Sequence, residues 1–151
     1  MTPPREAGMA CLLAGVLLLS GCASSSRSDD DYRHKAANTA ETAASAVNTA
    51  RIGVQAGGEG RVTGPYLSIL LGEAEKDLLA AQGTFESRQP PSPEADAVRD
   101  RLGDVLDDAA DALAAVRIAV RRGQVRELPD VGRDLPDLAE QLEGLEKELT
   151  S

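Results

Sequence analysis

The sequence feature that most restricts the fold is a repeat of apolar residues at alternating steps of three and four. It is clearest near the C-terminal end, where every member is a leucine or a valine: Leu128, Val131, Leu135, Leu138, Leu142, Leu145 and Leu149. Steps of three and four residues return to the same face of an α-helix, whereas the side chains of a strand alternate at every second residue. The repeat therefore predicts a helix with one buried face.

Three earlier segments carry the same repeat. Its members are Ala36, Ala40, Ala43, Val47, Ala50 and Val54, then Leu67, Leu71, Ala74, Leu78, Ala81 and Phe85 with Ile69 and Leu70 beside them, and then Val98, Leu102, Val105, Leu106, Ala109, Ala112, Leu113, Val116, Ala119 and Val120. Glycine and proline separate the segments, because both disfavour helix interiors. We expect helices at about 30–55, 65–87, 93–122 and 125–149, which predicts an all-α fold, an up-down-up-down four-helix bundle over residues 32–151.

Two parts of this pattern allow more than one interpretation. Pro136 interrupts the fourth segment, and either a kink or a new helix start at Asp134 fits it. The small seam residues of the first segment fit close helix packing, but they also fit a weakly held helix whose apolar edge exchanges onto a partner. Ile52 lies off that seam and is a candidate for an exposed patch.

The composition limits both the core and the partners. The chain has 151 residues and a net charge of −9, with 16 Lys and Arg against 25 Asp and Glu. This charge argues against nucleic acid as a partner and against attraction to an anionic membrane surface, because both are negative. Alanine is common and aromatic residues make up only 2% of the chain, so the larger aliphatic side chains must provide most of the stabilisation.

The first residues have the pattern of a targeting segment. Arg5 is followed by an apolar run from Gly8 to Leu19, which is shorter than the roughly 20 residues of a membrane-spanning helix. The run closes on Leu19-Ser20-Gly21-Cys22. This sequence resembles the lipobox of bacterial lipoproteins. The resemblance implies cleavage between Gly21 and Cys22 and a diacylglyceryl group on the Cys22 sulfur.

By this resemblance, residues 1–21 are a signal peptide, and the lipid on Cys22 holds the mature protein at the extracytoplasmic face of the cell membrane. Residues 22–31 are rich in serine and aspartate, and we expect them to form a flexible tether because they cannot bury apolar surface. Cys11 leaves with the signal peptide, so no thiol remains for a disulfide or a metal.

An acidic stripe on the third segment is the candidate ligand site. We name as the acidic stripe the residues Asp96, Asp100, Asp104, Asp107 and Asp111, with Asp108 beside them. Like charges at this spacing repel, so the stripe is a solvated face, or a divalent cation binds it, or arginines from other segments offset it: Arg51, Arg61, Arg126 or Arg133. Calcium needs six to eight converging oxygens, whereas a straight stripe spreads them along the helix. We therefore favour the solvated face and expect no metal or cofactor.

The sequence contains no recognisable catalytic constellation. His34 is the single histidine, the serines have no adjacent base, and Gly57-Gly58-Glu59-Gly60 lacks the strand and the lysine of a phosphate loop. We therefore expect a lipoprotein that is not an enzyme but a structural, adaptor or protein-binding module of the cell envelope, with another envelope protein as its partner. The alternative is a receptor lipoprotein for a small molecule or a cation.

Overall fold

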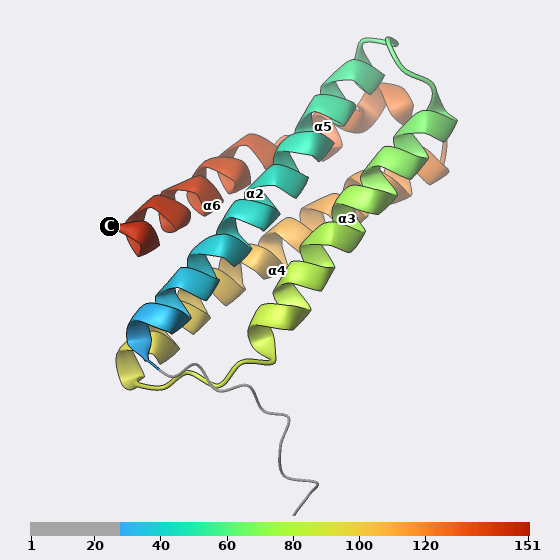
Figure 1. The fold of residues 1–151 in the computed structure, drawn as a ribbon. Helices are drawn as coiled ribbons and strands as arrows, with labels where there is room; N and C mark the ends of the chain where they lie inside the picture. Colours follow the sequence, from blue (N-terminus) through green and yellow to red (C-terminus); the bar gives the residue numbers. More distant parts are fainter. Residues whose placement is uncertain (1–27) are drawn as a thin grey trace, which may run out of the picture.

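The computed structural model describes residues 28–151, which are helical almost throughout (Figure 1). The elements are α2 (Asp29–Gly58), α3 (Gly64–Glu86), α4 (Pro93–Arg121), a short 3-10 helix η1 (Val125–Glu127), α5 (Leu128–Val131) and α6 (Leu135–Thr150). No strand occurs among residues 28–151, so the predicted all-α class is confirmed for this range. The predicted signal peptide (1–21), Cys22 and most of the predicted tether (22–31) lie outside the described residues.

Serines begin the first and third of the long helices. Ser28 Oγ accepts a hydrogen bond from Asp31 N at 3.2 Å, and Ser92 Oγ accepts one from Ala95 N at 3.1 Å. Both bonds satisfy backbone N–H groups that have no partner inside the helix. The tether prediction needs a correction here, because residues 29–31 belong to α2. Their carboxylates interact favourably with the positive N-terminal end of the helix dipole.

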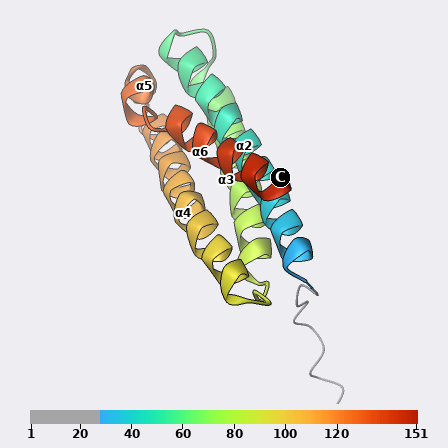
Figure 2. The ribbon, with the colours of Figure 1, turned by 90° about the vertical axis from the view of Figure 1, so that its left-hand side faces the viewer.

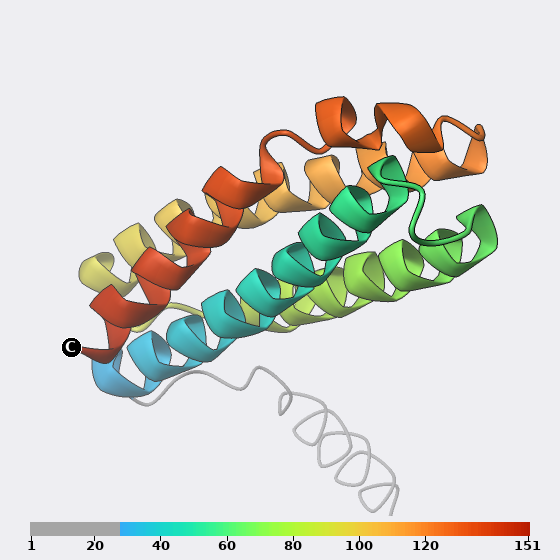
Figure 3. The same cartoon turned by 90° about the horizontal axis from the view of Figure 1, so that it is seen from above.

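The helix α2 is central to the packing. It has its most extensive contacts with α6 and α3, and it also contacts α4. The turn between α2 and α3 lies at one end of the molecule and the turn between α3 and α4 at the other (Figure 1). Figure 2 shows α6 lying at an angle to the other long helices. Its C-terminal end lies beside the first turns of α2 (Figure 3), where Arg33 Nη2 donates to Glu148 O at 3.1 Å. This packing is compatible with a four-helix bundle.

The predicted seams form most of the core. All six seam residues of α2 are buried, as are Leu67, Leu71, Leu78 and Phe85 of α3. The position of Ile69 beside the α3 seam predicts a wider buried face, but Ile69 is 69% exposed because it lies on the side away from the core seam. Val131 is also exposed, at 36%, in the short α5. No helix within residues 28–151 is both long enough and apolar enough to cross a membrane.

The fourth predicted helix, 125–149, is interrupted rather than continuous. The chain forms η1 and α5, leaves the helical path at Gly132, and starts α6 at Leu135 with Pro136 in its first turn. Proline is tolerated there because its missing N–H needs no partner in the first turn. The structure thus has the new start and not the kink, although the Asp134 side chain makes no capping bond. Gly132 is buried, and a Cβ at this position would lie only 3.0 Å from Leu135 Cδ1.

Candidate functional site

The acidic stripe lies on the surface of α4. All of its aspartates are exposed, and residues 96–111 extend along about 22 Å of helix axis at 1.5 Å per residue. Within the described part of the chain, no group of three or more His, Cys, Asp or Glu is placed to hold a metal ion. The structure therefore separates these carboxylates instead of bringing them to one point.

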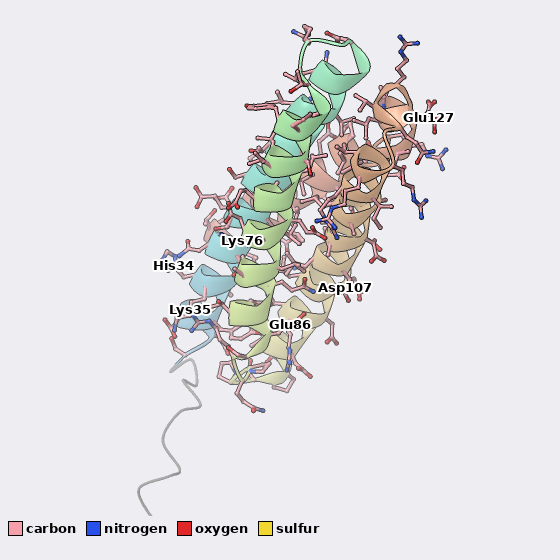
Figure 4. The ribbon with its side chains drawn as sticks, turned by 90° about the vertical axis from the view of Figure 1, so that its right-hand side faces the viewer. His34, Lys35, Lys76, Glu86, Asp107 and Glu127 are labelled. Atoms are coloured by element: carbon pink, nitrogen blue, oxygen red, sulfur yellow. The ribbon has the colours of Figure 1, made fainter. Side chains whose placement is uncertain are left out.

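A buried glutamine contacts the acidic stripe. Gln82 of α3 is only 8% exposed, and its Nε2 donates to Asp107 Oδ1 at 2.6 Å and to Glu86 Oε1 at 2.9 Å. Figure 4 shows Glu86 and Asp107 near the line where α3 and α4 meet. The amide thus satisfies two carboxylates that would otherwise repel across the interface. Sequence reasoning missed Gln82, because a single polar residue next to an apolar seam carries no periodic signal.

The arginines suggested as counter-charges to the acidic stripe lie elsewhere. Arg61 pairs with Glu59 at 2.5 Å, Arg133 pairs with Asp134 at 3.6 Å, Arg51 Nε donates to Asn48 Oδ1 at 3.2 Å, and Arg126 lies in η1. These pairings use neighbouring residues in the sequence and leave the stripe to solvent and to Gln82. The arginine alternative is therefore wrong.

We predict that calcium does not stabilise the protein beyond the effect of ionic strength. Dissolved ions screen exposed carboxylates diffusely when these are spread along one helix. A shaped calcium site would instead add about 2.7 kcal/mol to the free energy of unfolding at a hundredfold excess of calcium over its Kd. Replacing Asp104 by Asn should raise the free energy of unfolding by a few tenths of a kcal/mol, because repulsion with Asp100 and Asp108 is relieved. Thermal unfolding in calcium and in sodium chloride at equal ionic strength measures both effects.

A calcium-specific rise in melting temperature contradicts this prediction if it disappears in the double variant Asp104→Asn, Asp107→Asn. That result would support ion binding as the function of the protein. The variant Asp104→Asn alone keeps the hydrogen bond from Gln82 to Asp107. Its change in stability therefore reports the relief of charge repulsion without the loss of that bond.

Tyr32 has a buried hydroxyl near the start of α2. Its side chain is 0% exposed, and its ring centroid lies 5.4 Å from that of Phe85. Within residues 28–151, no group forms a hydrogen bond with the Tyr32 hydroxyl. Burial raises the pKa of this hydroxyl above its ordinary value of 10.0, while Arg99 opposes and Asp96 adds to the increase. An unpaired buried hydroxyl costs about 1 to 3 kcal/mol, so Tyr32 stabilises through its ring and not through its oxygen.

Replacing Tyr32 by Phe should raise the free energy of unfolding by about 1 kcal/mol, because the ring remains and the unpaired hydroxyl is removed. The difference in the free energy of unfolding between the variant and the wild type should grow above about pH 10. There the unfolded wild type ionises before the folded one, so the wild type loses stability as the pH rises through the raised pKa of the folded state. Urea unfolding at about pH 8 and about pH 11 tests this. A Phe variant with the same pH profile as the wild type would contradict it.

An ion pair joins α3 to α4. Arg117 Nη2 donates to Glu75 Oε1 at 3.0 Å, and Arg117 Nε pairs with Glu75 Oε2. Both side chains are mostly buried, at 22% and 15% exposure, so the forked pair is shielded from solvent. Its position between two packed helices gives it a structural role.

An open groove of about 890 Å3 runs between α2 and α3, and we name it the α2–α3 groove. Short side chains line much of it: Thr39, Thr42, Ser45, Ala46 and Thr49 from α2, and Ala74, Ala80, Ala81 and Thr84 from α3. Charged side chains also line it: Lys35, Glu41, Glu73, Asp77 and Arg88. In Figure 4, His34 and Lys35 lie on the other side of α3 from Asp107, so this groove is separate from the acidic stripe.

The helices α2 and α3 approach each other closely beside the turn that joins them, and Tyr32 and Phe85 connect them at the other end. A Cβ at Gly53 would lie 2.7 Å from Leu70 Cδ2, and a Cβ at Gly57 would lie 2.7 Å from Leu67 Cδ1. The two glycines therefore allow close contact beside the α2–α3 turn. Farther along, the facing side chains are too short to fill the space between the two helices.

No known protein family matches this chain, and no curated protein and no solved structure was found to be similar to it. Its function is therefore inferred from its residues and their geometry.

Proposed function

We propose that this chain is a lipid-anchored, non-enzymatic lipoprotein of the bacterial cell envelope that acts as a structural, adaptor or protein-binding module. The observation that carries this proposal is Leu19-Ser20-Gly21-Cys22 at the end of a short apolar run. Cleavage before Cys22 and transfer of a diacylglyceryl group to its sulfur hold the helical domain at the extracytoplasmic face of the membrane.

We also propose that the domain is an up-down-up-down bundle in which η1, α5 and α6 together form the fourth member. The positions of the first two turns at opposite ends of the molecule support this order (Figure 1). The links are short, at residues 59–63 and 87–92, and short links favour antiparallel neighbours.

The net charge of the chain supports attachment through lipid alone. The segment that carries Cys22 joins the domain at Asp29, whose Oδ1 accepts a hydrogen bond from Ser92 Oγ at 2.7 Å. The start of α2 and the turn between α3 and α4 therefore lie together. Glu94 adds to the three carboxylates of residues 29–31 at this end, where Lys35 pairs with Asp31 at 2.5 Å. The chain as a whole carries a net charge of −9, so an anionic bilayer repels it.

The described side chains offer little support for catalysis. His34 is exposed, and its ring nitrogen Nε2 lies 3.5 Å from Asn38 Nδ2, so an amide rather than a carboxylate orients it. A general base normally needs an orienting partner and a nucleophile within hydrogen-bond distance. The core consists of aliphatic side chains with the ring pair of Tyr32 and Phe85. These features fit a scaffold better than an enzyme.

Crosslinking in intact cells tests the proposed function. A short amine-reactive crosslinker, followed by purification of the full chain from membranes, should yield one reproducible envelope protein. The same treatment of the Cys22→Ala strain should lose that adduct, because the variant has no lipid anchor. Repeated recovery of the wild type without any partner would contradict the proposal.

The second candidate, a receptor for a small molecule or a cation at the acidic stripe, is supported by a hollow beside that stripe. A hollow of about 240 Å3 lies between α3 and α4, lined by Phe85, Glu86, Arg99, Asp100, Gly103, Asp104 and Asp107. Ligand pockets usually have about 300 to 1,000 Å3 and enclose most of their ligand. This hollow is small and borders the solvated acidic stripe, so we rank the receptor second.

A further inference from the structure

The threonines that line the α2–α3 groove make it less polar than their hydroxyl groups suggest. We name as the floor of the groove these threonines and the alanines beside them. Its threonines donate to carbonyl oxygens one turn back on their own helices: Thr42 Oγ1 to Asn38 O at 2.9 Å, Thr49 Oγ1 to Ser45 O at 2.9 Å, and Thr84 Oγ1 to Ala80 O at 2.8 Å. A hydroxyl bonded in this way has already used its one hydrogen and can only accept a further bond. These threonines therefore offer a ligand their methyl groups and no hydroxyl donor, next to the alanines of both helices.

The middle of the groove carries negative charge without an internal counter-ion. Glu41 of α2 and Asp77 of α3 line it from opposite sides, and neither makes an ion pair or a side-chain hydrogen bond within residues 28–151. Arg88 lies at the end of the groove that also contains Lys35. A helical ligand with basic residues at its centre thus has its charges matched at Glu41 and Asp77.

Two isoleucines are exposed near the opposite end of the groove, which Thr49, Leu70 and Glu73 line. Ile52 follows Thr49 by one turn of α2 and is 61% exposed, and Ile69 precedes Leu70 on α3 and is 69% exposed. Large aliphatic side chains exposed beside a groove are typical of docking surfaces for amphipathic helices.

A second copy of this chain fits the groove poorly. A two-fold interface places the same patch of both copies face to face. Glu41 and Asp77 lie at the middle of the groove, so they would oppose their own copies and repel. The charge pattern therefore favours a different protein as the occupant.

We propose that the α2–α3 groove binds a cationic amphipathic helix of the partner protein. Small and aliphatic residues of that helix lie on the methyl-lined floor and against Ile52 and Ile69, and its Lys or Arg side chains pair with Glu41 and Asp77. This inference rests on the proposed function, because it names the surface and the partner chemistry of the protein-binding module.

A peptide titration of the full chain tests this surface. The probe is a dye-labelled peptide of about 18 residues, or about 27 Å as a helix, with alanine and leucine on one face and lysine along both edges of that face. The full chain and its variants are kept in the same neutral detergent, so any binding of peptide to micelles is common to all of them. Fluorescence anisotropy gives the Kd for each protein.

The charge test uses two variants that lose the same net charge. Glu41→Gln with Asp77→Asn should weaken binding about fivefold or more, because two ion pairs are lost. Asp104→Asn with Asp108→Asn removes the same charge from α4, outside the groove, and should change the Kd less than about twofold. Equal weakening by the two variants would show attraction to overall charge and overturn the proposal.

The shape test uses two variants that add the same bulk. Ser45→Trp fills the groove and should weaken binding tenfold or more, whereas Ala115→Trp on the exposed surface of α4 should leave it unchanged. Melting curves establish that both variants fold. Binding by Ser45→Trp with the wild-type Kd would overturn the proposal.

The two proposals fail in different ways. If the cellular crosslink to an envelope partner persists in Ser45→Trp at its wild-type level, the groove is not the docking surface and the proposed function stands. If the groove binds the peptide as expected while no partner is ever crosslinked in cells, the proposed function fails.

Discussion

Replacing Leu142 by Ala should lower the free energy of unfolding by about 2 to 5 kcal/mol. Leu142 is 0% exposed and lies within α6, which packs most extensively on α2. The seam of α2 consists mainly of alanine, whose side chains cannot move to fill the space that the leucine leaves. Most of the cavity should therefore remain, and the cost should include both lost transfer free energy and the cavity itself. Chemical denaturation of the full chain, followed by circular dichroism, measures the change.

The same substitution at Leu79 provides the matched control. Leu79 lies on α3 and is 48% exposed, so Leu79→Ala removes the same atoms without opening a cavity in the core. It should change the free energy of unfolding by no more than about 0.5 kcal/mol. Equal destabilisation by the two variants would mean that the α6 seam does not contribute the burial that its position indicates.

Replacing Cys22 by Ala should abolish attachment of the lipid. Alanine has no sulfur to form the thioether with diacylglycerol, so the precursor should remain uncut or be shed. Incorporation of labelled fatty acid and fractionation of cells measure the effect, which should be close to all or none. Cys11→Ala is the matched control and should be labelled normally, because Cys11 lies in the segment that cleavage removes. Normal amounts of membrane-held, mature-length Cys22→Ala protein would contradict the lipoprotein proposal.

Apolar periodicity predicted the helices of this chain because burial follows the helical repeat even when the residues are small. The α2 seam shows this, since Ala36, Ala40 and Ala43 are fully buried although each contributes little area. Periodicity could not locate the break before α6, because Leu128 and Leu135 are both buried on either side of a link that is not helical. Pro136 marked this region in the sequence, and the break lies just before it, where Gly132 is buried and packs close to Leu135.

The candidate surfaces were harder to predict than the helices. The acidic stripe was visible as a spacing, but its contact with Gln82 depends on how α3 and α4 pair. The α2–α3 groove depends on close approach at Gly53 and on short side chains farther along both helices. Ile69 shows the same limit, because its apolar character suggested burial while the packing of α3 leaves it exposed. Single-helix patterns carry no information about such pairings.

The mass of the N-terminal peptide of protein extracted from membranes tests the lipid anchor most directly. We predict a peptide that begins at Cys22 and carries a diacylglyceryl group in thioether linkage on its sulfur. A peptide that begins at Met1 or at any residue other than Cys22, or one that begins at Cys22 with a free thiol, would contradict the assignment of this chain as a lipoprotein.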